Sequence, residues 1–195
     1  MVMLRELPDN FQLEQLRAAL KFVKNRRCAV DVGAHRGIWT RVMAREFAKV
    51  TAVEPNIKMF EQISDDLGNV KKVNAACGSR AGRCALADGK KNTGQTHCII
   101  GNEVEVVTID SMNLLEVDFI KIDVEGMEFD VLKGGRNTIE QSRPLIMIEE
   151  NGLCERYGHK TDRASRLLRR WGMVPLVTFH MKPEKDVNIL FGWVE

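Results

Sequence analysis

The sequence predicts an α/β fold with a central sheet of about seven strands, mostly parallel, and helices on both faces. Two observations predict it. Short apolar runs alternate along the chain with segments whose apolar residues recur at helical spacing. Acidic residues follow several of these runs directly, at the edge where parallel sheets bind ligands. A length of 195 residues is consistent with one domain, and we expect a single domain over 1–195.

Composition narrows the class of protein. Apolar residues make up 44% and charged residues 29%, which is ordinary for a soluble globular chain and excludes disorder. The net charge of +2 gives no reason to expect a nucleic-acid partner, and no apolar run approaches the length of a membrane span. Five cysteines without a C-x-x-C pair suggest neither a zinc site nor a disulfide framework. We expect a cytoplasmic protein that does not associate with membranes.

Five segments have helical periodicity: 10–24, 38–47, 56–67, 126–141 and 164–171. Asn56 can cap the third of these helices, and Gly68 stands where its C-terminus would need a positive φ. The fourth is interrupted at Gly134 and Gly135. The last has the clearest apolar stripe and ends before Gly172.

Five apolar runs predict buried parallel strands: 28–32, 50–53, 70–76, 117–123 and 144–148. The stretch 78–110 contains short pieces separated by glycines, which predicts an antiparallel excursion or a flexible loop. Two final strands, 174–179 and 188–194, predict a C-terminal hairpin around 182–185. That hairpin would add one antiparallel strand to the sheet.

The strongest functional signal is the turn between the first strand and its helix, Asp31-Val-Gly33-Ala-His-Arg-Gly37. Glycines allow a ligand to approach the backbone closely, and a helix N-terminus offers free N–H groups. The turn lacks the G-x-G-x-x-G pattern of dinucleotide sites, which argues against the alternative of a nicotinamide-dependent oxidoreductase. Glu54 ends the second strand, where an acid holds the ribose hydroxyls in nucleoside-binding α/β folds.

Several motifs occur in an order that resembles a known family. They are D-V-G-A-x-x-G from Asp31, A-V-E-P-N from Ala52, N-A-A-x-G from Asn74, T-I-D from Thr108, I-K-I-D-V-E-G-M-E from Ile120 and R-P-L-I-M-I-E-E from Arg143. Together they resemble the FkbM-type methyltransferases, S-adenosylmethionine-dependent enzymes with a Rossmann-like class I fold. The resemblance covers 28–151. It implies that the cofactor is bound by Asp31, Gly33, Ala34, Gly37, Glu54, Asn74, Ala75, Ala76 and Asp123. The chain departs from the family's usual asparagine after Gly-Ala, and has His35 and Arg36 there.

The acids after the fourth strand suggest the chemistry. We expect methyl transfer to an oxygen by in-line attack on the sulfonium methyl, with Asp123 or Glu125 orienting or deprotonating the acceptor hydroxyl. Glu125 could instead cap the helix that follows, and His35 is a further candidate for acid–base work. The family resemblance implies a small-molecule or carbohydrate acceptor. The alternative is a non-catalytic module that binds a partner through the basic face of the 160–171 helix.

A metal is a secondary possibility. Oxygen ligands suit Mg²⁺, and one all-oxygen set follows neighbouring strands: Asp123, Glu149, Glu150 and Asn151. Acids that only bind hydroxyl groups produce the same pattern without a metal.

Overall fold

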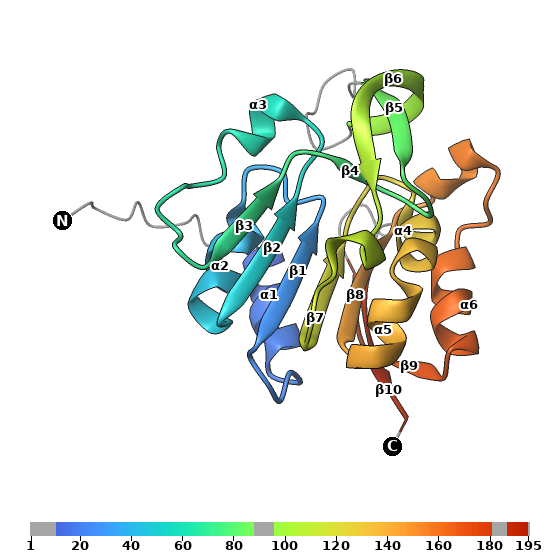
Figure 1. Cartoon of the computed structure of the whole chain (residues 1–195). Coiled ribbons are helices and arrows are strands. Elements are labelled where there is room, and N and C mark those ends of the chain that lie inside the picture. Colours follow the sequence, from blue (N-terminus) through green and yellow to red (C-terminus); the bar gives the residue numbers. More distant parts are fainter. Residues whose placement is uncertain (1–10, 88–95, 181–186, 195) are drawn as a thin grey trace.

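A seven-stranded sheet forms the centre of the computed structural model, which describes residues 11–87, 96–180 and 187–194. The strand order is β3-β2-β1-β7-β8-β10-β9 (Figure 1). The strands are β1 (Cys28–Val32), β2 (Lys49–Val53), β3 (Val70–Val73), β7 (Val117–Ile122), β8 (Leu145–Glu150), β9 (Met173–His180) and β10 (Val187–Trp193). Only β10 runs against its neighbours, so the mostly parallel sheet and the terminal hairpin are confirmed. The turn expected at 182–185 lies outside the described residues.

Helices cover both faces of the sheet. They are α1 (Phe11–Leu20), α2 (Ile38–Glu46), α3 (Ile57–Phe60), α4 (Glu128–Gly134), α5 (Arg136–Ser142) and α6 (Arg163–Arg170), with short 3₁₀ helices at η2 (Asp110–Met112) and η3 (Leu153–Tyr157). One core packs α1 and α2 against Ala29, Phe119 and Met147 of the sheet. The other packs α4, α5 and α6 against the alternate residues, such as Val30 and Ile120. None of the helices in these ranges is long and apolar enough to cross a lipid bilayer.

The period of two along each strand decides which side chains meet. Asp31 of β1 shares a face with Ala29, Lys121 of β7 with Phe119, and Glu149 of β8 with Met147. All three polar side chains therefore lie on the α1/α2 face. A buried hydrogen bond of 2.7 Å from the Asn188 amide of β10 to the Gln15 amide oxygen of α1 closes the same face.

The excursion after β3 forms a second, three-stranded sheet. Its strands β4 (Ala76–Cys77), β5 (Gly82–Ala87) and β6 (His97–Val107) lie in the order β4-β6-β5, and β5 pairs antiparallel with β6. The antiparallel alternative is thus confirmed for the described part. The small sheet stands at the arrowhead end of the main sheet (Figure 1). The strand expected over 70–76 is divided, since β3 belongs to the main sheet and β4 to the small one.

The predicted helix 56–67 is wrong beyond its first turn. Asn56 caps it as expected, with its side chain accepting from the N–H of Lys58, but α3 ends at Phe60. The chain then turns so that Ile63 packs tightly below Gly37. The Ile63 carbonyl accepts a hydrogen bond of 2.9 Å from the Lys72 ammonium. These long-range contacts replace the helical ones.

Candidate active site

A cavity of about 650 Å³ lies at the carboxyl ends of the central strands. Its walls come from the ends of β1, β2, β7 and β8, from β4, β5 and β6 and from η3. The lining includes Gly33, Ala34, His35, Arg36, Trp39, Glu54, Ala75, Ala76, Leu86, Thr96, His97, Cys98, Lys121, Asp123, Glu125, Glu149, Asn151 and Leu153. A cavity of this size suits a cofactor-sized ligand. The small sheet and the loop after Asn151 both contribute to it.

The Gly33 turn is shaped by contacts within the protein. Gly33 has φ of +79°, and a Cβ placed there would lie 1.8 Å from the main-chain oxygen of Asp123. The N–H groups of Gly33 and Ala34 both donate to the Val53 carbonyl, at 2.9 and 3.0 Å. Glycine is therefore required for the close approach of the ends of β1 and β7, in addition to any contact with a ligand.

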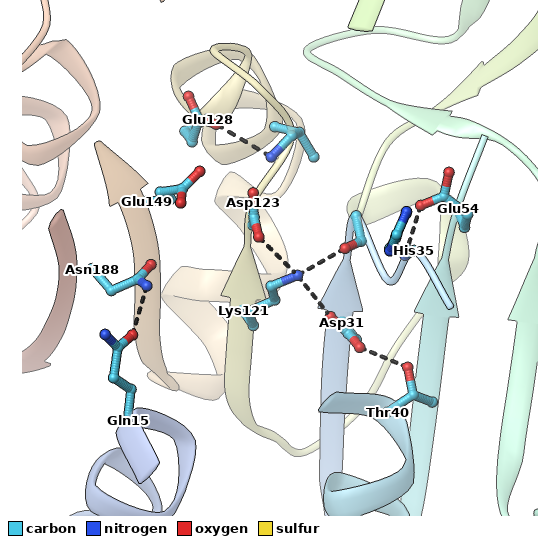
Figure 2. Close-up of polar contacts among 12 residues, drawn as sticks. Gln15, Asp31, His35, Thr40, Glu54, Lys121, Asp123, Glu128, Glu149 and Asn188 are labelled. Carbon is cyan, nitrogen blue, oxygen red and sulfur yellow. Dashed lines mark hydrogen bonds and ion pairs between the residues drawn. The ribbon is translucent and has the colours of Figure 1, made fainter. Parts of the chain in front are cut away.

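A buried lysine that the sequence analysis did not single out occupies the centre of the site. The Lys121 ammonium lies 3.3 Å from Asp31 Oδ1 and 3.4 Å from Asp123 Oδ2, and donates to the Gly33 carbonyl at 2.7 Å (Figure 2). Burial alone would lower the pKa of Lys121, but the two carboxylates outweigh it and the pKa is raised. Lys121 is therefore charged and ties β1 to β7 beneath the cavity.

Asp31 is completely buried and does not itself line the cavity. Its second oxygen accepts a hydrogen bond of 2.6 Å from the Thr40 hydroxyl of α2. The structure thus places Asp31 below Lys121. Its expected contact with a cofactor stays a prediction.

Glu54 is 6% exposed and lines the cavity at the end of β2. One carboxylate oxygen accepts from the N–H of His35 at 2.8 Å and the other from the N–H of Asn56 at 2.9 Å. Burial raises the pKa of Glu54, and these two hydrogen bonds and Lys121 oppose the rise. The acid is thus held in one orientation with lone pairs left for a ligand.

The other residues predicted to bind the cofactor differ in whether they line the cavity. Ala75 and Ala76 are buried and line the cavity next to Glu54. Asn74 is exposed, and its amide donates to the main-chain oxygens of Glu54 and Pro55, so it positions that loop from outside. Gly37, with φ of +73°, starts α2. Its contact with a cofactor stays a prediction.

His35 lines the cavity in the left-handed region, with φ of +50°. Burial lowers the pKa of its imidazole, and the positive charges of Arg36 and Lys121 lower it further. The surroundings therefore favour the neutral form of the ring.

Three carboxyl groups lie close together on the side of the cavity opposite His35 and Glu54 (Figure 2). Oxygens of Asp123, Glu125 and Glu149 lie within 4.8 Å of one another. Burial, followed by the charge of Asp123, raises the pKa of Glu149 to about 10, so Glu149 is protonated at neutral pH. The Asn151 amide donates to it at 2.9 Å.

The predicted oxygen set therefore needs one correction. Glu150 lies on the other face of β8, where its carboxylate accepts from the N–H of Ser165 in α6 at 3.2 Å. Consecutive strand residues face opposite ways, so Glu149 and Glu150 cannot serve one site. Glu125 takes the place of Glu150 in the cluster, which has the oxygen ligands that a hard cation prefers.

Glu128 holds the turn before α4, and a capping role of Glu125 stays a prediction. The N-cap residue of α4, Met127, makes no side-chain cap. The Glu128 carboxylate accepts from the N–H of Val124 at 3.2 Å (Figure 2) and from the N–H of Gly126 at 3.0 Å. Burial raises the pKa of Glu128 to about 7. Glu128 therefore holds the turn that carries Glu125, which itself has φ of +58°.

Comparison with known proteins agrees with this geometry. The methyltransferase FkbM domain model matches residues 31–174. No curated protein matches the chain significantly. Among solved structures, methyltransferase FkbM from Methylobacillus flagellatus KT is 18% identical with a TM-score of 0.59, covering 86% of this chain. Only 44% of that relative is covered, so the chain spans less than half its length.

Two further solved structures share the fold at low identity. Precorrin-6y C5,15-methyltransferase from Geobacter metallireducens GS-15 is 14% identical, with a TM-score of 0.57 and coverage of 93% of this chain and 88% of its own. TrmK from M. capricolum, solved with S-adenosyl-homocysteine, is 11% identical, with a TM-score of 0.55 and coverage of 91% and 67%. These likenesses confirm the Rossmann-like class I methyltransferase fold. The family model spans well over half of the sequence, and the chain belongs to the FkbM methyltransferase family.

Proposed function

We propose that the protein transfers a methyl group from S-adenosylmethionine to a hydroxyl oxygen of a small molecule or sugar. Membership of the FkbM methyltransferase family supports methyl transfer, and nothing in it supports the nicotinamide-dependent alternative. The observation that carries the cofactor assignment is Glu54, a buried acid that lines the cavity at the end of β2 with both oxygens held by main-chain N–H groups.

The residues present fit this cofactor. Each Glu54 oxygen keeps a lone pair after its main-chain hydrogen bond, so the carboxylate can accept from two vicinal ribose hydroxyls. Ala75 and Ala76 offer small apolar side chains beside it, where a flat base would fit. Gly33 and Ala34 line the cavity closer to Lys121 and Asp123, and would border the methionine part. A product of this cofactor in the structural neighbour TrmK supports the same choice.

The carboxyl groups around Asp123 would serve the acceptor. When bound, the cofactor supplies a methyl group on a positively charged sulfur. Asp123 forms an ion pair with Lys121, while Glu149 beside it is protonated and can donate a hydrogen bond. Asp123 or Glu125 then orients the acceptor hydroxyl and accepts its proton. Mg²⁺ forms no part of this proposal.

Calorimetric titration with S-adenosyl-homocysteine tests the cofactor site. Glu54→Ala should weaken binding by about 1.5–3 kcal/mol, because hydrogen bonds to a charged group are lost. Glu61→Ala, which removes an exposed acid just after α3, is the matched control and should bind normally. Equal affinity of the Glu54 variant and the wild type would remove Glu54 from the site. Titration with NAD should show no binding.

Turnover is tested with methyl-labelled cofactor and fractionated small molecules and glycans. Asp123→Asn and Glu125→Gln keep the shape of each side chain but remove its basicity. Loss of the base should reduce turnover by about 10²–10⁴-fold while cofactor affinity changes little. Full turnover in both variants would indicate that His35, and not either carboxylate, is the base. Tight cofactor binding without any labelled product would favour the non-catalytic binding module instead.

A further inference from the structure

Two thiols face each other in the wall of the cavity. Cys84 of β5 and Cys98 of β6 have sulfur atoms 2.8 Å apart, and both are free thiols. Cys98 pairs with Leu86 across the two strands. Cys84 precedes Leu86 by two residues and so shares its face of the small sheet. Leu86 and Cys98 both line the cavity, while Cys84 lies behind them and is 7% exposed.

A shift in strand register makes this contact possible. Ala85 pairs with Ile99, but Cys84 pairs with Val104, so four residues of β6 bulge out between these pairs. Cys98 is also held by η3, because its main-chain oxygen accepts a hydrogen bond of 2.9 Å from the Tyr157 hydroxyl. The two sulfur atoms are thus fixed next to each other by surrounding structure.

The three remaining cysteines differ in this respect. Cys28 and Cys154 have their thiols next to main-chain oxygens, and Cys77 is buried in β4. All five cysteines lie in described parts of the chain, and the pair of Cys84 and Cys98 is the one sulfur–sulfur contact among them.

We propose that Cys84 and Cys98 form a redox-active dithiol that a small peroxide converts reversibly to a disulfide in the wall of the cavity. The Cys98 thiolate attacks the peroxide oxygen, which gives a Cys98 sulfenic acid and, for hydrogen peroxide, one water. The Cys84 sulfur then displaces the sulfenic oxygen as a second water, and the S–S bond forms. Two thiols are oxidised and one peroxide is reduced to two waters. A dithiol reductant reverses the step by exchange.

The position of the two sulfur atoms favours a disulfide as the product but does not make oxidation of Cys98 faster. Burial and the neighbouring Cys84 thiol raise the pKa of Cys98, so its thiolate is scarce and oxidation should be slower than that of free cysteine. The sulfur atoms, however, need to approach by less than about 1 Å to reach the bond length of about 2.0 Å. In a reducing compartment the pair stays reduced until peroxide accumulates.

The intact chain treated with hydrogen peroxide and mapped without reduction tests the proposal. We expect one cross-linked peptide containing Cys84 and Cys98, with the mass of two hydrogens lost, and its disappearance on reduction. Cys154→Ser is the matched control, since it removes another buried thiol and should form the same cross-link. Cys84→Ser should stop at a Cys98 sulfenic acid, which a sulfenic-acid-specific reagent traps. Absence of the cross-link, or cross-links that involve Cys77 equally often, would overturn the proposal.

A second arm rests on the proposed function. Cys98 lines the cavity, so saturating S-adenosyl-homocysteine should slow formation of the disulfide at least several-fold relative to the chain without it. Failure of the dithiol proposal and failure of the proposed cofactor site give different results. A disulfide that forms at the same rate with and without this ligand supports the dithiol and contradicts a cofactor bound against the small sheet.

Discussion

Replacing Lys121 with Met tests whether the buried ammonium holds the floor of the site together. Asp31 is fully buried, and its Oδ1 lies 3.3 Å from the ammonium. At an effective dielectric constant of about 20, unit charges at that separation attract by about 5 kcal/mol. The cost of burying the ammonium offsets part of this attraction. Loss of one partner of a buried pair typically costs about 3–5 kcal/mol, and we expect Lys121→Met to lower the free energy of unfolding by that amount.

Urea denaturation at neutral pH, followed by circular dichroism, measures the effect. Lys71→Met, which removes an exposed lysine from β3, is the matched control and should stay within about 0.5 kcal/mol of the wild type. Adding Asp31→Asn to Lys121→Met should recover part of the loss, because the buried carboxylate no longer lacks a cation. A loss below about 1 kcal/mol for Lys121→Met, or a further loss in the double variant, would refute the reasoning.

Three further changes probe the surroundings of the cavity. Gly33→Ala should cost at least about 2 kcal/mol in thermal unfolding, since its Cβ would lie 1.8 Å from a main-chain oxygen at the end of β7, whereas Gly68→Ala has open space and should be tolerated. The pKa of Glu128 is about 7 when folded against an ordinary 4.5, so its contribution to stability is complete below about pH 4.5 and is lost as pH rises through 7. Glu128→Gln should remove this fall of about 3 kcal/mol, and an unchanged pH profile of the melting temperature would contradict it. Thr40→Val should cost about 1.5–3 kcal/mol in urea denaturation, because the buried Asp31 carboxylate loses a hydrogen bond of 2.6 Å, and a neutral result would show that water replaces the hydroxyl.

Much of the sheet could be predicted because buried parallel strands have an unmistakable composition. The runs at 28–32 and 117–123 are apolar and bounded by turns, and both became central strands. The helix expected over 56–67 failed because its boundaries depend on packing. Ile63 packs beneath Gly37 instead of continuing the helix, and the local sequence contains no sign of that contact.

The site residues that could be predicted are those whose place in the fold follows from their place after a strand. Glu54 follows a strand, so its place at the cavity edge could be expected. Lys121 could not be assigned a role, because a single lysine in an apolar run does not reveal that two carboxylates flank it. The separation of Glu149 from Glu150 could have been found from strand alternation alone. The contact between Cys84 and Cys98 depends on a register shift that no sequence pattern shows.

The position of β1 between β2 and β7 has a consequence for the order of folding. Cys28 pairs with Lys49 soon after it in the chain, but also with Val117, 89 positions later. Contacts between distant segments form late, because closing a long loop costs more entropy than closing a short one. A folding chain can therefore align β1, β2 and β3 while Asp31 still lacks the ammonium of Lys121. The floor of the cavity is completed only when β7 docks, so ligand binding should report the last step of folding and not the first.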